Sequence, residues 1–142
     1  MGTLVLTGAS SGSATLQSTD ATTTVITLPA TTGTVALAST IIGVGQTWQD
    51  VTASRALVTT YTNSTGKPIQ VNVWLSVAGS PTGNLDLNII VGSVTVAFSS
   101  SFHGTAAGNW TTFVTAIVPT GTTYSATSPV NIGGTLTWVE LR

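Results

Sequence analysis

The chain has 142 residues, a formal net charge of −1 and 5% charged residues, whereas an average soluble domain has about 25%. It contains no cysteine, which excludes disulfide bonds and thiolate metal sites. Its three basic residues, Arg55, Lys67 and Arg142, are scattered along the chain. The sequence therefore lacks the clustered positive charge that nucleic-acid binding requires.

Hydrophobic residues make up 42% of the chain. A surface with so few charges predicts that part of it packs against other subunits. The most apolar window, residues 35–44, is shorter than the ~20 residues that a membrane-spanning helix needs. The first residues, MGTLV, lack the basic start of a secretory signal. We therefore expect no membrane insertion and no export by a signal of the chain's own.

Residues 1–40 differ from the rest, because they contain no aromatic residue and a single charge, Asp20. Their short apolar pulses cannot bury enough area to offset about 1–2 kcal/mol of backbone entropy per residue. Either this segment is disordered or other copies of the chain complete it, and the uncharged, β-rich pulses favour the second alternative. The residues expected to form such a stalk are Leu4, Leu6, Leu16, Ile26, Leu28, Val35 and Leu37.

A glycine-containing connector places a domain boundary near residue 41 and a second domain over residues 41–142. Early in this domain, Trp48 and Val51 predict a first strand.

The next segments predict a hairpin. Residues 56–62 read as extended, and a cluster of turn formers occupies 63–68. Residues 69–77 then alternate between apolar and polar side chains, which is typical of a strand with two different faces. We expect the strands on either side of the turn to pair.

Further alternation follows. Leu85, Leu87 and Ile89 predict a strand, Gly92-Ser93 a two-residue turn, and residues 94–98 the returning strand. We interpret residues 99–110 as a long polar loop.

Strands are also predicted over residues 113–118 and 135–141, with a turn at 119–121. The second domain thus contains seven or eight predicted strands and no window typical of an amphipathic helix. This pattern indicates an all-β sandwich of the jelly-roll kind.

Residues 27–37, TLPATTGTVAL, resemble a recurring segment of bacteriophage tail-fibre and related virion proteins, which forms an intertwined three-chain β stalk. Residues 45–73 resemble the start of a C-terminal domain in these proteins, and residues 117–124 and 136–142 resemble its end. The resemblance implies a trimeric, virion-attached protein with an N-terminal β stalk or anchor and a C-terminal β knob. It implies no particular receptor.

The acidic residues form no evident catalytic pair. We expect Asp50 to make a salt bridge with Arg55, and Asp86 to be solvated on the polar face of its strand. Glu140 is expected to pair with Arg142 or with another subunit, and chain closure could also bring it near Asp50.

His103 is the one histidine, and without acidic or cysteine neighbours it makes a poor metal site, although three copies on a three-fold axis could supply three ligands. The sequence has neither a Gly-x-Ser-x-Gly elbow nor a phosphate-binding glycine loop. We therefore expect no enzymatic activity, no catalytic or metal-binding residues and no cofactor.

Binding is the remaining kind of site. Phe102, His103, Asn109 and Trp110 lie in or beside one glycine-rich stretch. Aromatic rings with adjacent amides are suited to contact with glycans, so these four residues are the candidate glycan contacts. The alternative is that Phe102 and Trp110 pack into the core or against a neighbouring subunit.

The leading hypothesis is a non-enzymatic bacteriophage structural protein, present on the virion as a homotrimeric fibre, spike or capsid decoration and made in the bacterial cytoplasm. If Met1 is the native start, the chain is a complete short spike or decoration. If the chain is a fragment, it is a fibre tip. Its partners would be its own copies and other virion proteins. The alternatives are a receptor-binding, lectin-like module for host glycan, a capsid cement protein and, last, a depolymerase.

Overall fold

A computed structural model describes residues 4–7, 13–16, 41–79, 83–103, 108–129 and 134–142. The chain divides into two units, Met1–Val35 and Ala36–Arg142. Each unit is described by itself.

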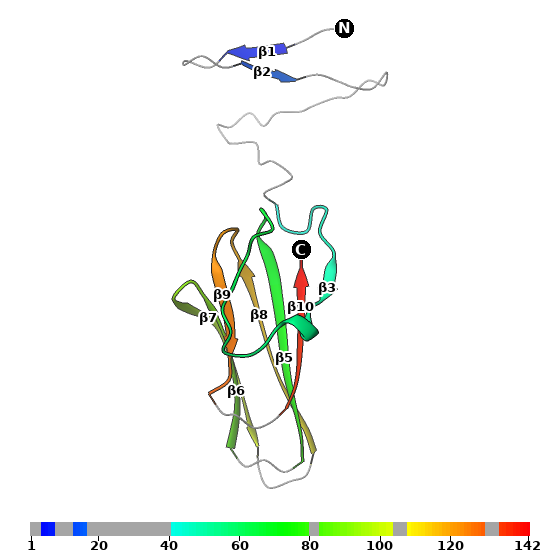
Figure 1. The fold of residues 1–142 in the computed structure, drawn as a ribbon, viewed down its shortest axis with the longest axis vertical. Coiled ribbons are helices and arrows are strands. Elements are labelled where there is room, and N and C mark those ends of the chain that lie inside the picture. Colours follow the sequence, from blue (N-terminus) through cyan, green and yellow to red (C-terminus); the bar gives the residue numbers. More distant parts are fainter. Residues whose placement is uncertain (1–3, 8–12, 17–40, 80–82, 104–107, 130–133) are drawn as a thin grey trace. The chain divides into compact units, whose positions relative to one another are not determined.

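In the first unit, β1 (Leu4–Thr7) pairs with β2 (Ser13–Leu16) in an antiparallel ladder that places Leu4 opposite Leu16 (Figure 1). Three of the expected stalk residues lie on these two strands. The others, Ile26, Leu28, Val35 and Leu37, lie outside the described residues, as does the segment just before the expected boundary at residue 41. The three-chain stalk stays a prediction.

The described part of the second unit is all β, as predicted, apart from one short 3-10 helix, η2 (Thr52–Ser54). It contains eight strands in two antiparallel four-stranded sheets, β3-β10-β5-β8 and β4-β9-β6-β7. The strands are β3 (Trp48–Asp50), β4 (Tyr61–Thr62), β5 (Ile69–Gly79), β6 (Gly83–Val91), β7 (Val94–His103), β8 (Gly108–Val118), β9 (Thr123–Thr127) and β10 (Thr135–Leu141).

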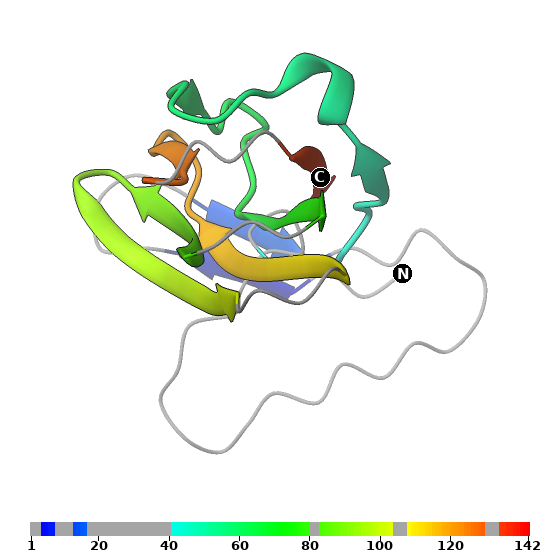
Figure 2. The same ribbon diagram turned by 90° about the horizontal axis from the view of Figure 1, so that it is seen from below.

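The strands pair as if one long hairpin had been rolled up. β6 pairs with β7, β5 with β8, β4 with β9 and β3 with β10, so the first strand meets the last. Lateral pairing of β5 with β10 and of β6 with β9 then joins these pairs into two sheets, seen nearly end-on in Figure 2. This strand order is that of a jelly roll, and we call the second unit the jelly-roll domain.

The core lies between the two sheets and follows the alternation in the sequence. Every second residue of β5 is buried from Ile69 to Val77, and Leu85, Leu87 and Ile89 of β6 are fully buried opposite them. From the other strands, Val114, Val118, Tyr124, Ala126 and Trp138 complete the interior.

The predicted hairpin between residues 56–62 and 69–77 is wrong. β4 pairs with β9, placing Tyr61 opposite Tyr124, and therefore belongs to the other sheet from β5. The turn formers instead carry the chain from one sheet to the other. Asn63 holds this crossover, because its buried side-chain amide donates to the carbonyl oxygens of Lys67 (2.7 Å) and Val118 (3.0 Å).

The predicted turn at Gly92-Ser93 is confirmed. It joins β6 to β7 with Val91 opposite Val94. Gly92 has a φ of +63°, which fits the first central position of a type II′ turn. Its N–H also donates to the carbonyl oxygen of Thr123 at 2.7 Å, so the turn is attached to β9.

Val58 is a strained position on the surface, with a φ of +64° and a side chain that is 75% exposed. A β-branched residue is disfavoured there, whereas glycine adopts this conformation freely. We expect Val58→Gly to raise the free energy of unfolding by about 1 kcal/mol, measured by urea denaturation. As a control, Val94→Gly changes an exposed strand valine and should be destabilising; a loss of stability in both variants would contradict the prediction.

Candidate functional site

Glu140 is the centre of the most connected polar cluster in the described part of the chain. Alternation along β10 places it on the same inward face as Trp138, and its side chain is fully buried. Its Oε1 accepts hydrogen bonds from Arg55 Nε (2.9 Å), the Tyr124 hydroxyl (2.7 Å) and Trp138 Nε1 (3.1 Å). Its Oε2 accepts from Arg55 Nη2 and Arg142 Nη1, both at 3.1 Å.

The hydrogen bonds to Glu140 connect several elements of the jelly-roll domain. A carboxylate has about four lone-pair sites, and the five hydrogen bonds to Glu140 occupy them without leaving an oxygen exposed to solvent. The Arg55 guanidinium also lies 4.4 Å from the centre of the Tyr61 ring, a cation–π geometry. The cluster therefore links β4, β9 and β10 with the segment that follows η2.

The expected salt bridge between Asp50 and Arg55 is wrong. Arg55 pairs with Glu140, and Asp50 Oδ1 accepts the backbone N–H of Thr52 at 2.9 Å. Hydrogen bonds from Thr52 lower the pKa of Asp50 below its ordinary value. The expected pairing of Glu140 with Arg142 is confirmed. Asp50 is exposed while Glu140 is buried, so the two carboxylates do not share a site.

The same cluster makes the free energy of unfolding depend on pH in the alkaline range. Burial raises the pKa of Tyr124 from 10.0 to about 12, and its hydrogen bond to Glu140 adds to the rise. Between these pH values the folded protein retains a proton that the unfolded chain releases. The contribution is therefore complete below pH 10 and is lost as pH approaches 12. We expect a loss on the order of 2–3 kcal/mol.

Urea denaturation at several pH values from about 9 to about 12 would measure this loss. Tyr124→Phe removes the titrating hydroxyl and should flatten the dependence. An equally steep decline in Tyr124→Phe would assign the effect to another group.

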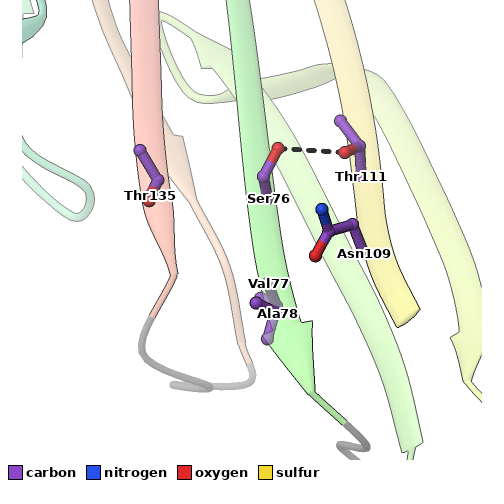
Figure 3. Close-up of a pocket in the computed structure, with 6 residues that line it drawn as sticks. All are labelled: Ser76, Val77, Ala78, Asn109, Thr111 and Thr135. Atoms are coloured by element: carbon purple, nitrogen blue, oxygen red, sulfur yellow. Dashed lines mark hydrogen bonds between the residues drawn. The ribbon is translucent and has the colours of Figure 1, made fainter. Parts of the chain in front are cut away.

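A shallow groove of about 230 Å³ lies on the outer face of sheet β3-β10-β5-β8. Figure 3 shows the residues that line it: Ser76, Val77, Ala78, Asn109, Thr111 and Thr135. The hydroxyls of Ser76 and Thr111 are 2.9 Å apart and hydrogen-bonded. The lining offers hydroxyl and amide groups and no charge, so its chemistry suits a neutral, hydroxyl-rich ligand.

Three of the four candidate glycan contacts, Phe102, Asn109 and Trp110, do not face the same way. Asn109 lies in the groove, on the outer face of β8, whereas the next residue, Trp110, is partly buried on the inward side of that strand. Phe102 is 76% exposed on β7, in the other sheet. His103 is the last residue of β7. Trp110 is thus partly buried, whereas Phe102 is exposed.

The loop predicted over residues 99–110 is mostly strand. β7 continues to His103 and β8 begins at Gly108, with residues 104–107 outside the described part. Ser99 and Ser101 pair with Leu87 and Leu85 of β6. Serine has little strand preference of its own, and pairing with this buried strand overrides it.

Sequence reasoning missed the groove and the buried state of Glu140. The groove has no local signal, because Ser76, Asn109 and Thr135 come from three strands. For Glu140 there was a signal, since period-two alternation places it on the same face as Trp138.

No group of three or more histidine and acidic side chains that could hold a metal ion is found among the described residues. Within the same residues, no helix is long and apolar enough to span a membrane. Comparison of the chain with protein-family models, curated proteins and solved structures finds no match.

Proposed function

We propose that this chain is a non-enzymatic structural protein of a bacteriophage virion, displayed on the particle as a homotrimeric fibre, spike or capsid decoration. The jelly roll hosts many functions, so the fold alone does not lead to this proposal. The resemblance of residues 27–37 and 45–73 to virion proteins supports it. The localisation on the virion and the other virion proteins as partners are parts of the same proposal.

The observation that carries the proposal is the nearly uncharged outer surface of the jelly-roll domain. Two of the charged side chains of this domain, Arg55 and Arg142, are paired with a third, the buried Glu140. Ten large apolar side chains are exposed among the described residues. A surface of hydroxyls and apolar groups favours association with further copies over a monomeric state.

The first unit is proposed to mount this domain on the particle. Its residues would form a three-chain β stalk, and the pairing of β1 with β2 supports a β conformation for part of it. Strands of four residues bury little area in one copy, which is the reason to involve three copies.

The test is the position and copy number of the protein on an intact particle, measured by labelling and quantitative mass spectrometry. Light scattering of the purified chain should give about 43 kDa, three times the 14.3 kDa of one copy. Absence from purified particles would refute the virion role. A single-copy mass at high concentration would refute the trimer.

The groove favours a second candidate function, a lectin-like module that binds host surface glycan. Asn109→Ala should then abolish binding to that glycan without changing the mass of the assembly. Thr137→Ala, on β10 with Thr135 and outside the groove lining, is the matched control. Unchanged adsorption in Asn109→Ala would exclude this use of the groove.

A further inference from the structure

One edge of the jelly-roll domain carries exposed apolar side chains on both of its sides. β7 and β8 are the terminal strands of their sheets, and a hydrogen bond from Thr112 Oγ1 to Ser99 Oγ (2.8 Å) joins them across the sandwich. Figure 2 shows the two strands meeting at this edge. We call it the apolar edge; its exposed side chains are Val96, Phe98 and Phe102 on β7 and Phe113 and Ile117 on β8.

The sequence of β7 and β8 alternates in a way that exposes these residues. Ala97, Ser99 and Ser101 of β7 are small and face inward, so the large residues Phe98 and Phe102 face outward. On β8, Thr112 and Val114 are buried and Phe113 is exposed, with its ring 5.0 Å from that of Trp74 on β5. Large side chains therefore occupy the outer surface where an isolated domain would carry polar ones.

The exposed apolar area is a large part of what a subunit contact needs. The five side chains are 42–76% exposed and present on the order of 500 Å² of apolar surface. One contact of β7 with β8 uses three of them from one copy and two from the next, and a standard interface buries about 1,600 Å² over both partners, of which somewhat more than half is apolar. Hydroxyl side chains of the same strands would supply the rest of the contact. β7 and β8 contain no Asp, Glu, Lys or Arg. One charged side chain, Asp86 of β6, stands opposite Ser100 on the same outer face, so the contact lies beside a single carboxylate.

We infer that the apolar edge is the surface through which copies of this chain associate, with β7 of one copy against β8 of the next. The inference rests on the proposed trimer and names its contact. The exposed apolar side chains of β7 and those of β8 differ in sequence and lie on opposite sides of the edge. The β7 set of one copy therefore contacts the β8 set of the next copy. Such a heterologous contact closes into a ring when the rotation between copies is 120°.

The competing arrangement is symmetric pairing of two β7 strands edge to edge. The register of β7 against β6 shifts between Ile89 and Ile90. A bulge of this kind twists an edge strand and hinders its pairing with another chain. This irregularity favours a side-chain contact over a continuous sheet.

The first test is the mass of the full chain by sedimentation equilibrium, for the wild type and for the double variant Phe98→Glu/Ile117→Glu. Each change adds a charge at an already exposed position, so folding should persist, as checked by circular dichroism. We expect association to weaken by on the order of a hundredfold or more, because unpaired charges would be buried at the contact. The matched control is Trp48→Glu on β3, half exposed and at the other end of the sheet order, which should leave the mass unchanged.

A wild-type trimer whose mass survives Phe98→Glu/Ile117→Glu would overturn this contact and leave the virion role standing. A monomeric wild type would overturn the contact and the proposed trimer together. Absence from particles would refute the virion role without bearing on the contact.

Cysteine cross-linking provides a second test, because the chain has no cysteine of its own. Ser100 and Thr115 are exposed on β7 and β8. With a short bis-maleimide, Ser100→Cys/Thr115→Cys should give covalent dimers and trimers and no larger products. Ser100→Cys alone should stay uncross-linked. Cross-linking of Ser100→Cys alone, or its absence in the double variant, would overturn the heterologous contact.

Discussion

Replacement of Glu140 by glutamine is expected to lower the free energy of unfolding by about 3–5 kcal/mol, the usual cost of breaking a buried ion pair. All five groups that contact this side chain are donors. Glutamine would present an amide NH₂ to some of them and would leave the guanidinium of Arg55 without its counter-charge. The measurement is urea denaturation at one fixed protein concentration, since association also contributes to apparent stability.

Asp50→Asn is the matched control. Asp50 lies on the neighbouring strand β3, is exposed, and accepts its hydrogen bond from the backbone of Thr52. Its replacement should leave the denaturation midpoint nearly unchanged. A Glu140→Gln variant within about 1 kcal/mol of the wild type would mean that desolvation of the carboxylate cancels its hydrogen bonds.

Leu87→Ala is expected to lower the free energy of unfolding by about 2–5 kcal/mol. Leu87 is fully buried in the middle of β6 and belongs to the core shared by both sheets. Truncation loses the transfer free energy of the side chain and leaves a cavity, because strands on both sides hold the neighbouring side chains in place. Urea denaturation of the full chain is again the measurement.

Ile41→Ala is the comparison for this second prediction, because Ile41 is 42% exposed and lies outside the core cluster. Ile41→Ala should lower the free energy of unfolding by less than half as much as Leu87→Ala. Equal effects at the two positions would indicate that the sheets do not enclose a common, tightly packed interior.

Local patterns identified much of the fold. The alternation over residues 69–77 and 85–89 correctly predicted which side chains are buried, because in a strand the inward face depends on period two alone. The last strand, Thr135–Leu141, was also predicted with its observed bounds. Gly92 correctly marked a hairpin turn, since its positive φ is a local requirement.

Other features depend on partners that are distant in the chain. The turn formers at 63–68 indicate that the chain reverses, but not whether the next strand pairs with the previous one or joins another sheet. Residues 99–103 are strand because β6 lies beside them. Of the candidate glycan contacts, Asn109 and Trp110 were predicted together from their adjacency, although adjacent strand residues face opposite sides.

The sequence by itself determined that this protein is all β, which faces of its longest strands are buried, and that its surface carries unusually few charges. Tertiary structure alone decided the jelly-roll strand order, the enclosure of Glu140 by Arg55 from a segment 85 residues away, and the position of large apolar side chains on both sides of one edge. The physical reason is how far apart in the sequence the interacting residues lie. Burial and turn preference are properties of neighbouring residues, whereas strand partners and ion pairs are chosen by closure of the whole chain.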